Sequence, residues 1–145
     1  MSKLTSNYFA EISNLIAQAK SNAEIAINSE LVLLYWNVGK VIKEQILEGN
    51  KPEYGKSVIS QLSSQLVNEY DRGYGQRNLA NMVKFYEVFS DAQILHTLCA
   101  KLTWSHFRQL MYIEEQNKRK FYIELAINER WSVRELDGRI ILKQH

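Results

Sequence analysis

Two amphipathic segments joined by a short turn, at residues 54–89, constrain the fold more than any other feature of the chain. In residues 54–70 the apolar side chains recur one, three and four positions apart, as on one face of a helix: Val58, Ile59, Leu62, Leu66 and Tyr70. Gly73 and Gly75 then stop this helix, because glycine permits backbone conformations that a helix excludes. Residues 76–89 form a second apolar face from Leu79, Met82, Val83, Tyr86 and Phe89. The stretch therefore predicts a helix-turn-helix-like pair, 54–70 and 76–89.

The rest of the chain repeats the same helical periodicity and offers few turn residues. One proline and six glycines are too few for an all-β protein of 145 residues, and no stretch alternates apolar and polar residues as a strand does. The further segments with helical spacing are 7–20, 23–48, 91–99, 103–113, 115–129 and the one that begins at 133. Only Ser21-Asn22 separates the first two, so they are either two helices or one long bent helix. We predict a single all-α domain of about six to eight helices.

The polar side of residues 76–89 has the composition of a nucleic-acid contact. Arg77, Asn81 and Lys84 lie four and three residues apart, and therefore on one side of the predicted helix, opposite its apolar face. Arg and Asn can form paired hydrogen bonds with guanine and adenine edges. Any surface helix of a bundle also has a polar stripe, however, so periodicity alone leaves a purely structural helix as the alternative.

Composition describes an ordinary folded protein and gives no case for catalysis. The formal charge is +2, with −1 over residues 1–50 and +3 over the remainder, which fits a DNA partner without requiring one. Cys99 is the single cysteine and lies in an apolar run, so we expect a buried thiol and no disulfide. His96 and His106 lack companion ligands, and no phosphate-binding glycine loop occurs. We therefore expect no enzyme activity, no metal and no cofactor.

The absence of a signal-peptide pattern and of any membrane-length apolar stretch predicts a cytoplasmic protein. Three local features carry structural predictions. Gly39, inside an otherwise helical pattern, indicates the close approach of another helix, and Trp36 is expected in a core or interface. Ser132 and Glu135 form a capping box at the start of the last helix.

Three groups of residues resemble a known family. The first is Tyr35-Trp36, Gly39-Lys40 and Ile42; the second runs from Tyr54-Gly55 through Gly73-Tyr74 and Arg77-Asn78-Leu79 to Phe85-Tyr86; the third is Trp104-Ser105-His106, Phe121-Tyr122 and Trp131 to Leu136. At these positions the sequence resembles the amino-terminal domain of YhcG-type bacterial proteins, which usually carry a PD-(D/E)XK nuclease domain after it. Val83 departs from the pattern, since an arginine is common there.

The resemblance implies a helical DNA-binding module attached to a nuclease. No nuclease domain follows His145, so residues 1–145 are expected to be the N-terminal helical domain alone. The resemblance gives Arg77 and Asn78 a DNA-facing role, and the full predicted DNA-binding set is Arg77, Asn78, Asn81, Lys84 and Arg72. The alternative is a helical dimerisation or protein-interaction module that positions a separate nuclease domain or subunit. With either function we expect a homodimer formed through the N-terminal helices, residues 23–48.

Overall fold

The computed structural model describes the backbone of residues 2–144 and the side chains of residues 8–141. This part of the chain is all-α, as the periodicity predicts, with no strand. Its elements in order are α1 (Ser2–Val41), the π-helical turn η1 (Ile42–Leu47), α2 (Pro52–Glu69), the 3₁₀ turn η2 (Arg72–Tyr74), α3 (Gln76–Val88), α4 (Ala92–Cys99), α5 (Trp104–Leu110), α6 (Gln116–Asn128) and α7 (Val133–Gln144).

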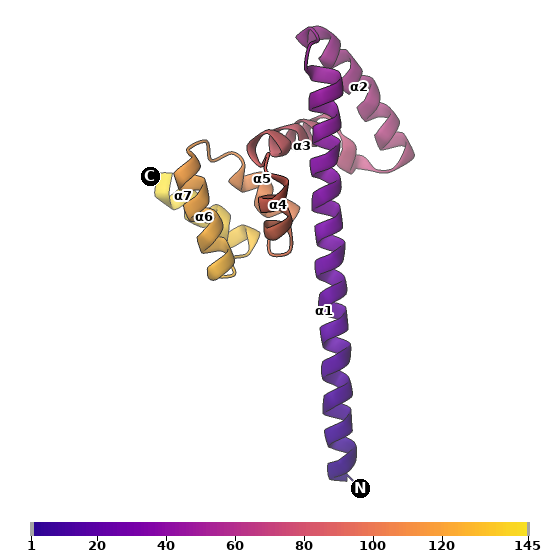
Figure 1. The fold of residues 1–145 in the computed structure, drawn as a ribbon, viewed down its shortest axis with the longest axis vertical. Coiled ribbons are helices and arrows are strands. Elements are labelled where there is room, and N and C mark those ends of the chain that lie inside the picture. Colours follow the sequence, from indigo (N-terminus) through magenta and orange to yellow (C-terminus); the bar gives the residue numbers. More distant parts are fainter. Residues whose placement is uncertain (1, 145) are drawn as a thin grey trace.

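Helix α1 dominates the shape of the molecule. At 40 residues it is about 60 Å long, and Figure 1 shows its N-terminal half projecting beyond all other elements. The two N-terminal segments of the sequence are thus one helix to Val41, and Ser21-Asn22 does not interrupt it. In Figure 1, α4–α7 lie on one side of the upper part of α1, while α2 folds back along its other side.

Helices α1 and α3 cross in close contact at Gly39. A Cβ atom placed on Gly39 would lie 1.9 Å from the carbonyl oxygen of Met82, so only glycine allows the two backbones to meet. Three residues earlier, the Trp36 indole is buried and its Nε1 donates a hydrogen bond of 2.8 Å to the carbonyl of Phe89. Both predictions are confirmed: Gly39 permits a helix contact and Trp36 belongs to the core.

Helix α3 lies at the centre of the fold because its buried side chains contribute to two hydrophobic cores. Leu79, Met82 and Val83 form a small core with Ile42, against which α2 packs through partly buried residues such as Leu62. The larger core continues through α4–α7, and its buried residues are Val32, Trp36, Phe85, Phe89, Leu95, Cys99, Leu102, Phe107, Leu110, Met111, Ile113, Tyr122, Ala126 and Leu136. Cys99 is buried there, as expected.

Side chains cap the short helices and fix where they begin. Asp91 accepts hydrogen bonds from the amides of Gln93 and Ile94 at the start of α4. The predicted capping box at α7 is present, because the Glu135 amide donates to Ser132 Oγ and the Ser132 amide donates to the Glu135 carboxylate. These caps supply partners for the amides that every helix leaves unpaired at its first turn.

The buried hydroxyl of Tyr122 provides a test of the core. It has no hydrogen-bond partner among the described residues, and burial raises its pKa. Because an unpaired buried hydroxyl costs free energy, Tyr122→Phe is expected to keep or raise the free energy of unfolding, by up to about 1 kcal/mol. Thermal denaturation should show an unchanged or higher Tm.

The matched variant is Tyr86→Phe, which removes a hydroxyl that donates a 2.7 Å hydrogen bond to the Glu44 carboxylate. Tyr86→Phe should lower Tm slightly. A clear loss of Tm in Tyr122→Phe would show that the hydroxyl has a partner that the core arrangement does not reveal.

Candidate nucleic-acid interface

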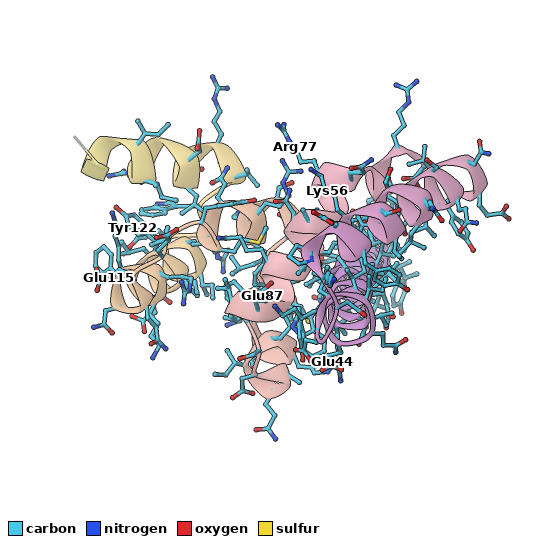
Figure 2. The ribbon with its side chains drawn as sticks, turned by 90° about the horizontal axis from the view of Figure 1, so that it is seen from above. Glu44, Lys56, Arg77, Glu87, Glu115 and Tyr122 are labelled. Carbon is cyan, nitrogen blue, oxygen red and sulfur yellow. The ribbon has the colours of Figure 1, made fainter. Side chains whose placement is uncertain are left out.

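The predicted DNA-binding residues occupy several environments around α3. Arg77 lies in the first turn of α3 and is exposed, and Figure 2 shows its side chain pointing out of the body. Arg72 is also exposed, on the 3₁₀ turn before α3, whereas Asn78 is half-buried. In the view of Figure 2, the carboxylates Glu44 and Glu87 lie on the opposite side of the body from Arg77.

Asn81 does not lie on an open face of α3. It is only 7% exposed, and its side-chain oxygen accepts a hydrogen bond from the hydroxyl of Tyr112. Helical periodicity places Asn81 opposite the apolar stripe of α3, but α5 and the residues after it pack over that side. The prediction of an open polar face at Asn81 is therefore wrong, because a tertiary contact covers part of the stripe.

Lys84 reaches the same tyrosine from the next turn of α3. Its ammonium lies 4.7 Å from the centre of the Tyr112 ring, within the range of a cation–π contact. Tyr112 itself is 57% exposed, so the ring and the lysine stand at the surface while the tyrosine hydroxyl reaches inward to Asn81. This arrangement holds the charge of Lys84 beside Tyr112, whose hydroxyl contacts Asn81.

A cleft of about 500 Å³ lies between α3, α5 and the start of α7. Two of the five predicted DNA-binding residues, Arg77 and Asn81, line this cleft. A second arginine, Arg108, which was not predicted from the sequence, lines it as well. The complete lining is Arg77, Asn81, Ser105, Arg108, Gln109, Tyr112 and Val133. No acidic residue lines it, and its size is that of a typical ligand pocket.

The two arginines of the cleft are free to bind an anion. Among residues 8–141 the structure pairs neither Arg77 nor Arg108 with a carboxylate, and its ion pair joins Lys43 to Glu87 at 3.8 Å. The Gln109 side-chain oxygen is buried in the wall of the cleft and lacks a hydrogen-bond partner among the described residues. The cleft therefore combines two guanidinium groups that are not paired with a carboxylate and one buried amide oxygen that has no donor.

The α5 side of the cleft escaped the sequence prediction, although a signal for it exists. Four polar residues of the cleft recur three, one and three positions apart, a spacing that places them on one face of a helix: Ser105, Arg108, Gln109 and Tyr112. The buried side chains His106, Phe107 and Leu110 alternate with them. Nothing in the sequence indicates that this face meets α3, because that contact depends on how α3 and α5 pack around the shared core.

Two further findings concern the whole described chain. No group of three or more His, Cys, Asp or Glu side chains in its described part is arranged to hold a metal ion. None of the helices described between residues 2 and 144 is long and apolar enough to cross a membrane.

The fold and the cleft define a class: an all-helical domain with a cationic pocket beside the helix that follows a glycine-bearing turn. Residues 11–145 match the model of the DUF1016 N-terminal domain, and the chain belongs to that family. It is also 25% identical over 159 aligned positions to the "Putative nuclease YhcG" of Escherichia coli (strain K12), an alignment that covers 89% of this chain. The resemblance to YhcG-type amino-terminal domains is thus confirmed.

The chain spans 42% of the length of that curated relative. No solved structure matches the chain.

Proposed function

We propose that this domain is a non-catalytic DNA-binding module of a nuclease-associated protein, and that it contacts DNA through the cleft between α3 and α5. The observation that supports the proposal is the convergence of Arg77 and Arg108 on one cleft without an acidic residue in its lining. Guanidinium groups bind phosphate oxygens through two parallel hydrogen bonds, so two unpaired arginines favour an anionic partner.

The surroundings of the cleft favour a nucleic-acid strand over a small anion. Lys84 stands beside the cleft and Arg72 lies on the turn before α3, so positive charge extends past the pocket itself. Glu44 and Glu87 lie on the other side of the body, which leaves the Arg77 side free of their repulsion. Phosphate contacts of this kind position a protein on DNA, and an amide group such as that of Asn78 can add base contacts.

The name of the curated relative supports the same partner. That protein is named "Putative nuclease YhcG", and a nuclease acts on nucleic acid. This chain matches less than half of it, so the proposal gives the module a targeting role and assigns cleavage to a nuclease domain or subunit. A DNA partner also accords with the cytoplasmic location that the sequence predicts.

The test of this proposal is Arg77→Ala. If Arg77 reads a base edge, the change should weaken specific binding by about 1–3 kcal/mol and relax the preference at one position. If Arg77 contacts phosphate alone, binding should weaken by the same factor for every DNA sequence. The slope of the logarithm of the binding constant against the logarithm of the salt concentration should then fall by about one. Fluorescence anisotropy with labelled duplex and single-stranded DNA, at two salt concentrations, measures both effects. Because Arg77 is exposed, Tm should change little.

Two variants complete the design. Arg108→Ala should weaken binding in the same way, since it lines the same cleft. Lys120→Ala removes an exposed positive charge from α6 and serves as the matched control, with binding close to that of the parent. Equal binding by the parent and both arginine variants, or equal loss in all three variants, would refute the cleft as the DNA contact.

The second candidate function is protein interaction, and the exposure of α1 favours it. The side chains of residues 8–27 are all exposed, and they include large apolar ones such as Phe9, at 73%, and Leu15. A helix without tertiary contacts is marginal in water, because most helical stability in proteins comes from packing an apolar face. We infer that α1 mediates self-association. The predicted segment 23–48 then forms only part of the contact, which extends toward residue 8.

A further inference from the structure

The projecting part of α1 and the upper part of the same helix carry one continuous apolar seam. Its residues are spaced three, four or seven positions apart, and therefore follow one line along the helix. We define the seam as Phe9, Ile12, Ile16, Ala19, Ala23, Ile27, Leu34 and Val41, all of which are exposed.

The seam points away from the body of the molecule. At 100° per residue, it lies about opposite the side of α1 that contacts α3–α5. That inner side carries Asn28 and Ser29, which donate hydrogen bonds to the carbonyl of Cys99, together with Val32, Trp36 and Gly39. A second helix can thus lie along the seam without meeting α3–α7.

At its upper end the seam enters an apolar groove between α1 and α2. The groove has a volume of about 290 Å³, presents only apolar surface, and is lined by Asn37, Val38, Val41, Ile42, Leu62 and Leu66. The seam thus has an uncovered apolar feature at each end. Its lower end is the projecting part of α1 with large exposed side chains, and its upper end is a groove that can hold a side chain.

We propose that two copies of this chain pair through α1 in antiparallel orientation, with the projecting half of each α1 lying along the upper half of the other. The proposal rests on the self-association stated above and adds its orientation, register and docking site. In the register centred on Ile25, Phe9 of one copy lies level with Val41 of the other and enters the groove. Ile16 then lies level with Leu34, and Ala23 with Ile27.

Size and charge both support this register. Near the centre of this register the small residues Ala19 and Ala23 lie level with the large residues Leu31 and Ile27, so small side chains meet large ones there. Lys20 lies level with Glu30 of the other copy, and twofold symmetry repeats this opposite-charge pair. Parallel pairing would place Lys20 against Lys20 and leave both grooves empty. An isologous antiparallel pair covers every part of the seam on both copies.

The first experiment is light scattering on the parent chain and on three variants. The parent is expected at twice the chain mass of 17.0 kDa. Ile16→Glu removes a seam contact of the projecting half and Val41→Glu obstructs the groove, so both should be monomers at concentrations where the parent is a dimer. Asn14→Glu places the same charge on the projecting half, on the side away from the seam, and should remain a dimer.

The second experiment determines the orientation with a short bismaleimide crosslinker. Ile16→Cys and Leu34→Cys are prepared separately and then mixed. In the proposed register, residue 16 of one copy meets residue 34 of the other, while like residues lie about 27 Å apart. Crosslinked dimers should form in the mixture and in neither variant alone. The parent, whose Cys99 is buried, gives the background.

The results test self-association and the antiparallel register separately. A monomeric parent at all concentrations would overturn self-association and the register together. A dimer that crosslinks within Ile16→Cys alone would retain self-association and overturn the antiparallel arrangement. A dimer unaffected by Ile16→Glu and Val41→Glu would overturn the seam. DNA binding by the cleft is measured separately and does not depend on any of these results.

Discussion

Gly39→Ala is expected to destabilise the protein strongly, although the same change stabilises most helices. In an ordinary helix, alanine is favoured over glycine by about 1 kcal/mol. Here the new methyl carbon would lie 1.9 Å from the Met82 carbonyl oxygen and 2.5 Å from its carbon. These are backbone atoms of α3, which cannot rotate away as a side chain can, so the two helices must separate. Because α3 contributes to both cores, we expect a loss of about 3–5 kcal/mol in the free energy of unfolding.

Gly138→Ala is the matched control for this prediction. Gly138 also lies inside a helix, α7, but nothing lies within 4 Å of the position that its Cβ would take. Its change to alanine should therefore raise the stability by roughly 0.5–1 kcal/mol. Urea denaturation of both variants gives the comparison. If Gly39→Ala were as stable as Gly138→Ala, α1 and α3 would not cross at this glycine in solution.

The parts of the fold that could be predicted from the sequence are those with local causes. The expected helices 54–70 and 76–89 agree with α2 and α3 within two residues, because an apolar stripe and two glycines define them. The capping box at Ser132 and the close approach at Gly39 were predicted for equally local reasons. The sequence could not decide whether residues 7–48 form one helix or two, because Ser21-Asn22 is compatible with either.

The candidate site could be predicted only in part. Arg77 was expected at the surface, and it lies there, because the apolar stripe of α3 determines which residues face away from the core. The same rule failed for Asn81, which α3 presents to Tyr112 and not to solvent. It did not identify Arg108 at all. Both errors have one cause: a helical stripe describes one helix, whereas the cleft is formed where the stripes of α3 and α5 meet. The role of these residues in DNA binding stays a prediction.

His106→Ala is expected to have the second large effect on stability, through hydrogen bonds that join three segments. The Thr103 amide donates to His106 Nδ1 at 3.1 Å, so this nitrogen carries no proton. The proton is then on Nε2, which donates to the carbonyl of Trp131 at 2.8 Å. One neutral imidazole therefore caps the start of α5 and ties it to the turn before α7. Alanine would leave these partly buried hydrogen-bond partners unpaired and open a cavity at the buried His106, at a cost of about 2–4 kcal/mol.

His96→Ala controls for the loss of a histidine, because His96 is exposed on α4, and a change within about 0.5 kcal/mol is expected there. Thermal and urea denaturation measure the stability of both variants. DNA binding should change as well. His106 joins α5 to the turn before α7, and the wall of the cleft combines Arg108 of α5 with Val133 of α7. His106→Ala should therefore weaken DNA binding even under conditions where it remains folded, whereas His96→Ala should not. Unchanged stability in His106→Ala would mean that the capping box and the Trp131 contact do not hold α5 in place.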